Sequence, residues 1–432
     1  MKGPNFRNLH RRRYFLSDDE VISLVNAYDT PLWVLSEDNL RMSCQRAKDF
    51  PNLYGLTVRY AMKAWSLGAV LKIVDQEGLH IDASSGFEVW RALRSDIAPE
   101  RIQLTCQEMP EPHELEEFVR LGVKFNASSL HQLQTFGELF PRQSVSIRIN
   151  PGFGSSKSAD TNVGGLTSSF GIWHEYLHTA TAIAKSCFLE INGIHFHIGS
   201  AVQTKIWKLA VKCVMAFAKE VPTVTRMSLG GGFDVGRMPN DRDMNIVSSG
   251  RTLLPLFEQF AADTGRRLHV EIEPGAFIVA HAGALVMRIH DIVDTGEDGF
   301  VFYKVDGGMN ELLQPADYGM QHHLVTVPRL GHISKPTKQE VVVVGHCCET
   351  GDCLTMDLTD TSKLAPRMVL RAEIDDYMVA YGAGGYNDSC GAKDYNSFPT
   401  AAVVIKPCQG DFALVRERET LDDILRHERW PY

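Results

Sequence analysis

A lysine with apolar neighbours is the first residue of this sequence whose type and surroundings suggest chemistry. Lys63 lies in the run RYAMKAWS, at the end of a strand-like stretch. Most lysines are solvated surface charges, but the apolar neighbours of Lys63 predict partial burial, which destabilises the ammonium form. The neutral amine can form an imine with a carbonyl compound. Lys63 is therefore a candidate for covalent attachment of such a compound.

The run HFHIGS places two histidines two residues apart. Alternate residues of a strand share a face, so His195 and His197 are expected to point the same way. Such a pair can bind a metal or stack on a ring, but the sequence offers no third ligand at a suitable spacing. Gly199 and Ser200 follow and suit an anion, so a phosphate compound fits here at least as well as zinc.

Glycines and carboxylates mark two further strand ends. The glycines Gly230, Gly231 and Gly232 of the run LGGGF offer main-chain amides that can cradle a phosphate, although a tight turn would also explain them. In VEIEPG, Glu271 and Glu273 share a strand face. A carboxylate at this position could pair with a protonated pyridine nitrogen.

The elements that must position these residues follow a repeating pattern. Between about residues 36 and 280, strand-like runs alternate with helical patterns, which is typical of βα units. Eight such units close a barrel whose chemistry gathers at the carboxyl ends of its strands. The eight runs are TVRYAMKA, LHIDASS, RIQLTC, VKFNASS, SVSIRINPG, INGIHFHIGS, RMSLGGGF and HVEIEPG. We therefore predict an α/β protein with a TIM-like (β/α)8 barrel over residues 36–280.

The remaining chain shows a different pattern. After about residue 281, strand-like runs such as ALVMRIHDIV and EVVVVGHCC follow one another without long helices between them. This predicts a second, all-β C-terminal domain, resembling a β-sandwich or barrel, over residues 281–432. The early run TPLWVL suggests that residues 1–35 join this domain.

Composition narrows the classes of function. The net charge of −9 and the pI near 6.0 argue against a nucleic-acid partner. The nine cysteines lack a metal-ligand spacing and suggest reduced thiols. No apolar stretch resembles a signal peptide or reaches the roughly 18 residues of a membrane span. We expect a cytoplasmic protein with no metal and no membrane partner.

Taken together and in this order, the runs resemble the fold-type III pyridoxal-phosphate-dependent decarboxylases, and diaminopimelate decarboxylases most closely. The resemblance extends over nearly the whole chain. The matching runs are YAMKA, HFHIGS, LGGGF, EPG, VDGGM, HCCETGD and RERETLDDIL. The resemblance implies a carboxy-lyase that removes the α-carboxylate of an amino acid as carbon dioxide, in lysine biosynthesis.

The resemblance also implies roles for individual residues in binding pyridoxal 5'-phosphate. Lys63 would carry the cofactor as a Schiff base, Glu273 would pair with its pyridine nitrogen, and His197 would stack on its ring. The rest of the cofactor site would comprise Asp82, Ser200, Gly230, Gly231, Gly232, Gly275 and Tyr386.

A homodimer with shared active sites is a further implication, because the family's run corresponding to HCCETGD reaches the neighbouring subunit. Cys348 would donate a proton to the substrate carbon after carbon dioxide leaves, and Glu349 would contact the distal amine. The other expected substrate contacts are Asp352, Tyr318 and Gln314. A simpler alternative is that Cys347 and Cys348 are two buried, small apolar residues.

Three positions depart from the family. Ala276 replaces the arginine of E-P-G-R, Gln314 stands where an arginine usually precedes the P/A-x-x-Y run, and Gly384 replaces the tyrosine of G-A-Y, with Tyr386 two residues later. A second substrate carboxylate needs paired donors, so we expect weak activity on meso-diaminopimelate.

Several alternatives to diaminopimelate decarboxylation remain open. The substrate could lack the distal carboxylate, as a lysine- or ornithine-like compound does, or be an elaborated amino acid of secondary metabolism. An amino-acid racemase is disfavoured by the HCCETGD run. A non-catalytic regulator that binds the cofactor is disfavoured because Lys63, His197, Glu273 and Cys348 are all retained.

Overall fold

The computed structural model describes residues 14–155, 163–200, 203–330, 337–357 and 359–431. The chain divides into two compact units. The barrel unit comprises Arg41–Val235 and Asp243–Ile278. The β unit comprises the chain up to Leu40, the segment Gly236–Arg242 and the chain from Val279 onward. Each unit therefore combines segments that are distant in the sequence.

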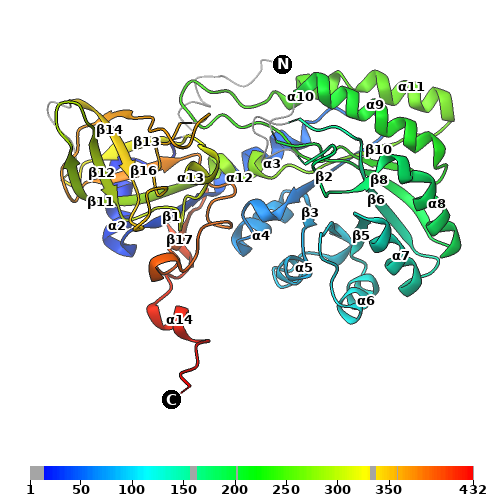
Figure 1. Cartoon of the computed structure of the whole chain (residues 1–432), viewed down its shortest axis with the longest axis horizontal. Coiled ribbons are helices and arrows are strands. Elements are labelled where there is room, and N and C mark those ends of the chain that lie inside the picture. The colour runs from blue at the N-terminus through cyan, green and yellow to red at the C-terminus, as the bar shows by residue number, and fades with distance from the viewer. Residues whose placement is uncertain (1–13, 156–162, 201–202, 331–336, 358, 432) are drawn as a thin grey trace. The chain divides into compact units, whose positions relative to one another are not determined.

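The barrel unit contains a closed parallel sheet of eight strands with helices on its outside (Figure 1). The order around the sheet is β5-β4-β3-β2-β10-β9-β8-β6, and pairing of β5 with β6 closes it. These strands are β2 (Leu56–Ala61), β3 (His80–Ala83), β4 (Ile102–Leu104), β5 (Lys124–Ala127), β6 (Ser144–Asn150), β8 (Glu190–His195), β9 (Arg226–Ser228) and β10 (His269–Ile272). The short β7 (Ile172–Trp173) pairs with β6. Each of the eight predicted runs forms one strand, which confirms the TIM-like barrel.

Helices follow most barrel strands, and small polar residues begin several of them. The Ser85 and Ser129 side chains accept from the main-chain amides of Glu88 and Gln132, which satisfies groups that a helix start leaves unpaired. The helices in this part of the chain are α3 (Glu37–Lys48), α4 (Gly68–Gln76), α5 (Gly86–Leu93), α6 (Pro112–Leu121), α7 (Leu130–Leu139), α8 (Leu177–Ser186), α9 (Thr204–Glu220), α10 (Ile246–Arg251), α11 (Leu254–Thr264) and α12 (Ala276–Val279).

One level of the barrel interior is filled by charged and polar side chains. Arg59 Nη2 lies 3.0 Å from Glu271 Oε1, and Arg226 Nη1 lies 3.4 Å from the same oxygen. Burial favours a raised pKa for Glu271, but the charges of Arg59 and Arg226 outweigh it and lower that pKa. Gln103 also lines this layer, which leaves no space for a water molecule. Glu271 therefore belongs to the packing of the barrel.

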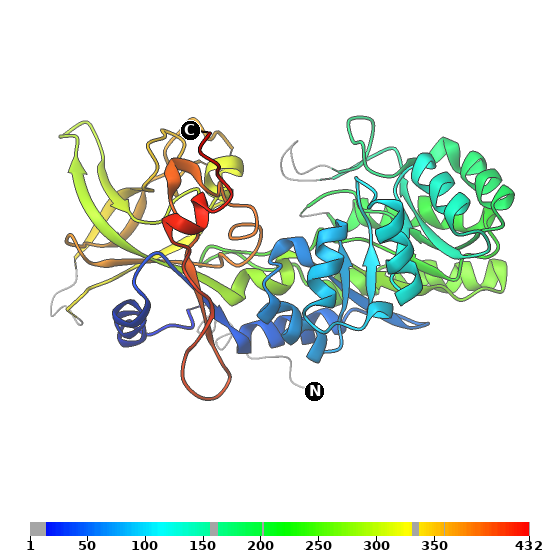
Figure 2. The same ribbon diagram turned by 90° about the horizontal axis from the view of Figure 1, so that it is seen from below.

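The β unit contains a second sheet of nine strands, mostly antiparallel. Its order is β15-β14-β12-β11-β1-β17-β18, and β16 pairs with both β11 and β13. The strands are β1 (Leu32–Ser36), β11 (Gly283–Asp294), β12 (Val301–Val305), β13 (His323–Val327), β14 (Lys338–Val344), β15 (Arg367–Leu370), β16 (Tyr377–Tyr381), β17 (Ala402–Lys406) and β18 (Ala413–Arg416). Figure 2 shows β11, in yellow-green, as a long strand that turns back into β12. The predicted separate β domain is confirmed.

The β unit also contains short helices that the sequence pattern did not predict. These are α2 (Asp18–Tyr28), α13 (Gln314–Tyr318) and α14 (Leu421–Leu425). Ser17 and Glu20 form a reciprocal cap at the start of α2. Leu24 of this helix packs into the sheet core with Leu32 and Val286, so burial of its apolar face holds α2 in place.

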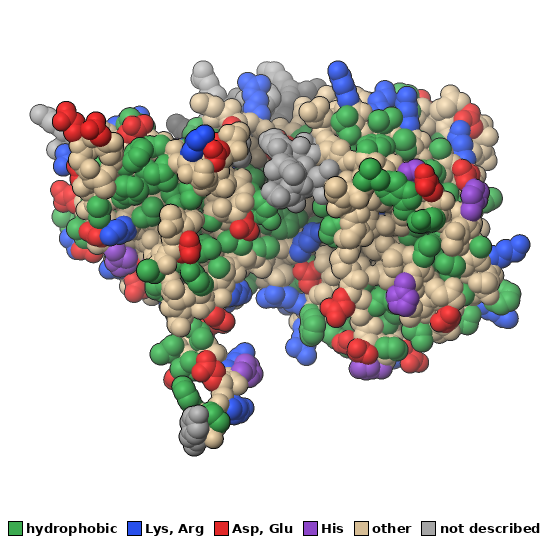
Figure 3. All heavy atoms as spheres, viewed as in Figure 1, with side chains coloured by type: hydrophobic (Ala, Val, Ile, Leu, Met, Phe, Trp, Pro, Cys, Tyr) green, Lys and Arg blue, Asp and Glu red, His purple; other side chains and the backbone are tan. Residues whose placement is uncertain are grey.

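The surface carries charges of both signs. On the face shown in Figure 3, basic and acidic side chains are interspersed with apolar ones. Among the residues that the structure describes, no helix has both the length and the hydropathy required to cross a lipid bilayer.

Candidate active site

Lys63 lies directly after β2, in the short 3₁₀ helix η1 (Met62–Ala64). This position at the carboxyl end of a barrel strand is the one expected from the sequence. Met62 and Ala64 are buried, but the Lys63 side chain is exposed in the single chain. The expected partial burial of Lys63 is therefore wrong for the chain by itself.

Glu273 is a buried carboxylate immediately after β10. Its Oε2 lies 3.1 Å from His195 Nε2, and its Oε1 accepts a hydrogen bond of 2.6 Å from the Ser228 hydroxyl. Burial favours a raised pKa for Glu273, but the charge of His195 and these hydrogen bonds outweigh it and lower the pKa to about 2. Glu273 therefore stays ionised and can hold a cationic group.

A chain of polar contacts links Glu273 to Asp82 through side chains from several barrel strands and their ends. His195 Nδ1 lies 2.8 Å from Asn126 Nδ2, which donates to Thr105 Oγ1 (3.2 Å). Thr105 in turn donates to Asp82 Oδ1 (2.9 Å). The sequence placed His195 beside His197 on one face but gave no role to Thr105 or Asn126, because pairing between strands is not visible in one strand's pattern.

Asp82 and Glu273 differ in their ionisation. Burial raises the pKa of Asp82 well above its ordinary value and the negative charge of Glu273 adds to the rise, while Lys63 and Thr105 oppose it. Two buried carboxyls that interact share their protons unequally. Of the two carboxyls, Asp82 is therefore the one that protonates more readily, and Glu273 the one that holds its negative charge more firmly.

His197 is half-buried, two residues after the end of β8. Its Nδ1 is buried and has no hydrogen-bond partner among the described residues. Burial, together with the charges of Arg148 and Lys63, lowers the pKa of His197 well below its ordinary value. The imidazole is therefore neutral and available to stack on a ring at the barrel mouth.

The LGGGF run forms a turn in which the main chain comes very close to neighbouring strands. A Cβ atom on Gly230 or Gly231 would collide with the carbonyl oxygen of Phe196 or Glu273. Gly230 and Gly232 also have positive φ angles of 65° and 92°. Side chains therefore do not fit at Gly230 and Gly231, so only the main chain can contact a ligand at these positions.

Two other predicted phosphate contacts lie on nearby connections of the chain. Ser200 is exposed, directly after the HFHIG run. Gly275 is half-buried and immediately precedes α12, whose first residue is Ala276. The arginine that usually follows Gly275 in the family is thus replaced by a helical alanine.

The HCCETGD run forms a loop after β14 in the β unit. Cys347 is buried, whereas Cys348 and Glu349 are exposed. The alternative that both cysteines are buried apolar residues is therefore wrong for Cys348. Burial, with the nearby charge of Asp352, raises the pKa of the Cys347 thiol to about 12.

Asp352 ties this loop to the VDGGM run. Its two carboxylate oxygens accept from the main-chain amides of Met309 (2.7 Å) and Cys347 (2.8 Å). A Cβ atom on Gly308 or Gly345 would collide with this carboxylate, which explains both glycines. These contacts give Asp352 a clear structural role, and its contact with a substrate stays a prediction.

Asn310 and a strained turn complete the frame around the loop. Asn310 Oδ1 accepts from Cys347 Sγ (2.6 Å), and its Nδ2 donates to the Tyr395 carbonyl (3.1 Å). In the turn, Asn396 Oδ1 accepts from the Cys348 amide (2.7 Å). Residues with positive φ angles are Asp394, Asn396 and Ser397, and such strain gathers at functional sites. These contacts of Asn310 and Asn396 were not predicted from the sequence. The only indication of them in the sequence is the asparagine that follows the VDGGM run.

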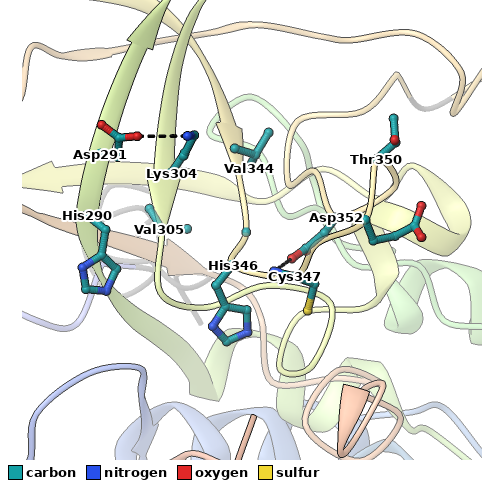
Figure 4. Close-up of a pocket in the computed structure, with 11 residues that line it drawn as sticks. His290, Asp291, Lys304, Val305, Val344, His346, Cys347, Thr350 and Asp352 are labelled. Carbon is teal, nitrogen blue, oxygen red and sulfur yellow. Dashed lines mark hydrogen bonds and ion pairs between the residues drawn. The ribbon is translucent and has the colours of Figure 1, made fainter. Parts of the chain in front are cut away.

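A cavity of about 460 Å³ lies between β11, β12 and the loop that carries Cys347 (Figure 4). Lys304 and Asp291 form an ion pair of 2.9 Å on one side. Thr350 lies on the other side, and Glu349 also lines the cavity, so carboxylates and an ammonium line the same space. The lining residues are His290, Asp291, Lys304, Val305, Val344, Gly345, His346, Cys347, Glu349, Thr350 and Asp352.

Gln314 is buried at the start of α13 and contacts an arginine that the sequence analysis did not consider. Gln314 Oε1 accepts from Arg237 Nη2 (3.2 Å), and Arg237 is buried too. Arg237 belongs to Gly236–Arg242, the segment that joins the β unit from within the barrel sequence. A guanidinium is therefore present beside the position where the family's arginine is missing.

The glycine-rich run after β16 departs from the family for a steric reason. A Cβ atom on Gly384 would collide with the carbonyl oxygen of Val279, so a tyrosine does not fit at this position. Tyr386 is half-buried and has a positive φ of 58°. Tyr318 ends α13 with 38% of its surface exposed. Their contacts with cofactor and substrate stay predictions.

Within the described residues, no group of three or more His, Cys, Asp or Glu side chains forms a candidate metal site. Among these residues, the two histidines of the HFHIGS run are therefore not part of such a group. His195 is engaged by Glu273 and Asn126, and the two ring nitrogens of His195 thus both have protein contacts.

Comparisons with known proteins cover both units. A family model described as "Pyridoxal-dependent decarboxylase, pyridoxal binding domain" matches residues 38–280. The chain is 32% identical over 412 residues to a diaminopimelate decarboxylase of Streptomyces coelicolor, which covers 94% of this chain and 90% of that protein. It is also 30% identical over 422 residues to the diaminopimelate decarboxylase of Escherichia coli K12. This match covers 96% of this chain and 97% of that protein. A crystal structure of a diaminopimelate decarboxylase, 29% identical, matches with a TM-score of 0.87 over 95% and 96% of the two chains.

Proposed function

Because the chain belongs to the pyridoxal-dependent decarboxylases, we propose that it removes the α-carboxylate of a diamino acid as carbon dioxide, with pyridoxal 5'-phosphate bound in the barrel unit. The observation that carries this proposal is the ionised Glu273, buried at the barrel mouth and 3.1 Å from His195. A carboxylate held there keeps a proton on a pyridine nitrogen.

The residues around Glu273 fit this cofactor. The buried Nδ1 of His197 and its neutral ring suit a stacked aromatic partner, and the side-chain-free turn at Gly230 and Gly231 suits a phosphate. The cofactor supplies an electron sink for the pair of electrons that remains when carbon dioxide departs. Ser200 and Gly275 add a hydroxyl and a main-chain amide for the phosphate.

Lys63 attaches the cofactor through its side-chain amine. The amine must be neutral to react, and the exposure of Lys63 in the single chain leaves it accessible to an incoming carbonyl group. Burial and the charge of Glu273 raise the pKa of Asp82, while the charge of Lys63 opposes the rise. These residues bind and orient the cofactor from two strand ends of the same barrel.

Cys348 and Glu349 act in the active site of a second copy of the chain, in a homodimer with shared sites. Cys348 donates a proton to the substrate carbon, and Glu349 contacts the distal ammonium group. Both side chains are exposed, and the Cys348 amide is fixed by Asn396 while Tyr395 Oη donates to Glu349 Oε2 (3.4 Å). The loop is thus held in shape, with its reactive side chains uncovered.

Carbon dioxide release from cofactor-loaded protein tests this function directly. The substrates to compare are the diaminopimelate isomers, L- and D-lysine, L- and D-ornithine, and arginine. We expect release from one diamino acid at a rate typical of enzymes, and loss of release in Lys63→Ala. Absence of release from every compound would count against the proposal. With diaminopimelate as substrate the product is lysine, which places the reaction in lysine biosynthesis.

A further inference from the structure

Asn310 joins the loop that carries Cys347 and Cys348 to a turn 82 to 85 positions further along the chain. Its Nδ2 donates to the main-chain carbonyls of Ala392 (2.9 Å) and Tyr395 (3.1 Å). Its Oδ1 accepts from Cys347 Sγ (2.6 Å), in the residue directly before Cys348. Only 8% of the surface of Asn310 is exposed. One buried side-chain amide therefore holds both segments.

The turn holds the two residues that we place in the active site of a second copy. Asn396 Oδ1 accepts from the Cys348 amide (2.7 Å), and Tyr395 Oη donates to Glu349 Oε2 (3.4 Å). Asn396 and Ser397 have positive φ angles of 52° and 60°. Residues without the freedom of glycine keep such angles when the surrounding structure imposes them. The shape of this turn therefore depends on contacts outside it.

Main-chain contacts supply part of this support. The Ala392 amide donates to the Met309 carbonyl (3.0 Å), which fixes the start of the turn. The Asn310 side chain extends the support to Tyr395, the residue directly before Asn396. The part of the turn that contacts the loop is thus the part held by the Asn310 amide.

The direction of the Asn310 amide determines where its neighbours carry their hydrogens. Nδ2 faces two carbonyl oxygens, so Oδ1 faces Cys347 Sγ and also His346 Nε2, which lies 3.0 Å away. An amide oxygen only accepts, so Cys347 is a thiol and His346 carries its hydrogen on Nε2. Burial raises the pKa of Cys347 to about 12 and lowers that of His346 to about 4, which agrees with this arrangement. Both donors to Asn310 are therefore neutral at neutral pH.

The loop also has space into which it can move. His346, Cys347 and Glu349 line the cavity of about 460 Å³ (Figure 4). Side chains that border such a space lack packing contacts on that side. Their positions therefore depend more strongly on hydrogen bonds, such as those to Asn310.

We propose that Asn310 is a positioning residue for the proton donor Cys348. The inference rests on the proposed function and adds to it a residue that acts through its neighbours. Asn310 acts on Cys348 from two directions, through the adjacent Cys347 and through the turn at Asn396. A displacement of about 1 Å can lower the rate of a reaction about 100-fold, so loss of either contact should lower kcat.

Two variants of Asn310 test the inference by carbon dioxide release. Asn310→Ser removes the amide. Asn310→Asp keeps the shape and the acceptor for Cys347, but its carboxyl supplies one donor at most to the carbonyls of Ala392 and Tyr395. We expect kcat to fall about 10- to 100-fold in both variants, with the amino acid from which the wild type releases carbon dioxide.

A matched control is Asn39→Asp. Asn39 is also a buried asparagine of the β unit, and its Nδ2 donates to the His281 carbonyl (2.9 Å). Its contacts lie outside the loop and the turn that Asn310 joins. This variant should keep the wild-type kcat.

Mixed dimers assign the effect of Asn310 to the subunit that supplies the loop. Asn310→Ser mixed with Lys63→Ala should recover about a quarter of wild-type activity, because the Lys63→Ala chain supplies an intact loop to the site that retains its lysine. Asn310→Ser mixed with Cys348→Ala should gain nothing over the separate variants, because both chains supply a defective loop. Asn310→Asp takes the place of Asn310→Ser in these mixtures if Asn310→Ser does not fold.

Labelling with iodoacetamide adds a measurement without turnover. In Asn310→Ser the Cys347 thiol loses the amide oxygen that accepts its hydrogen. The ratio of label on Cys347 to label on Cys348 should therefore rise about 2- to 10-fold, as peptide mass mapping can show. Asn39→Asp should keep the wild-type ratio.

Three results would overturn the inference. These are a wild-type kcat in Asn310→Ser, a wild-type labelling ratio in that variant, and recovery of activity when it is mixed with Cys348→Ala. Absence of recovery between Lys63→Ala and Cys348→Ala would instead contradict the shared site, and kcat with labelling would then decide the role of Asn310. Absence of carbon dioxide release from the wild type would contradict the proposed function, and the labelling ratio would still decide whether Asn310 holds the loop.

Discussion

His195 Nε2 and Glu273 Oε2 lie 3.1 Å apart at the mouth of the barrel. This contact opposes the effect of burial on Glu273 and keeps its pKa near 2. His195 is itself held through Asn126. The charge of Glu273 therefore depends on a residue from another strand.

We expect His195→Phe to raise the pKa of Glu273, because burial is then less opposed. A carboxyl whose pKa lies one unit above the working pH is ionised in about a tenth of the molecules. The variant should therefore lose about tenfold or more in kcat at pH 6 and recover as the pH rises, whereas the wild type shows no such limb between pH 5 and 8. A pH profile of kcat measures this. Ser228→Ala, which removes a neutral donor, should have a smaller effect, and a wild-type profile in His195→Phe would contradict the argument.

Replacing Lys63 tests the cofactor attachment. Lys63→Ala should abolish the absorbance band near about 420 nm that a covalently bound pyridoxal compound gives. Lys72→Ala is the control, because Lys72 is an exposed lysine of α4 that pairs with Asp96. Survival of the band in Lys63→Ala would show that the anchor is another residue.

The two adjacent cysteines should differ in reactivity and in their effect on catalysis. Cys348 is exposed, while Cys347 is buried with a raised pKa of about 12. Iodoacetamide should modify Cys348 first, as peptide mass mapping can show. Cys348→Ala should lower kcat about 10²- to 10⁴-fold through loss of the proton donor, and Cys347→Ser much less. Faster modification of Cys347 would reverse the assignment.

Mixed dimers test whether the active site is shared. Lys63→Ala and Cys348→Ala remove residues from different units, so a hybrid dimer of the two keeps one intact site. Random mixing should restore about a quarter of wild-type activity, because half of the dimers are hybrids and each has one working site. Activity no higher than that of the separate variants would rule out the shared site.

Glu311 makes stability depend on pH. Burial raises its pKa to about 8, with Asp306 and Asp352 adding to the rise. Because the folded pKa is above the ordinary value of 4.5, the unfolded chain loses this proton first as the pH rises. Stability is therefore lost between about pH 4.5 and 8, by up to about 1.4 kcal/mol per pH unit.

Glu311→Gln removes this titration while keeping an acceptor for the Gly308 amide. Relative to wild type, the variant should gain free energy of unfolding between pH 5 and pH 8, as measured by urea unfolding at both values. The same difference between variant and wild type at the two pH values would contradict the assignment of a raised pKa to Glu311.

Much of the fold was predictable because it rests on patterns within single segments. The eight runs ended in glycine, proline or serine and alternated with helical patterns, so the barrel followed from local periodicity. Lys63 and Glu273 were placed at strand ends for the same reason. Helix α2 was missed because its only strong local signal is the cap formed by Ser17 and Glu20.

Contacts between distant segments could not be predicted from one sequence. The Arg237 guanidinium reaches Gln314 across 77 positions, and Asn310 meets Cys347 across 37. No periodic pattern in the sequence indicates that the residues of either pair are in contact. Gly384 illustrates the same limit, since the carbonyl of Val279 that excludes a side chain there is far away in sequence.

The ionic layer of Arg59, Glu271 and Arg226 also determines how small molecules travel. No water molecule fits within that layer, so the barrel axis is plugged below His195. A small molecule near Glu273 therefore finds no space the size of a water molecule among the side chains of this layer, so the ionic layer that packs the barrel also separates the residues at its mouth from its opposite end.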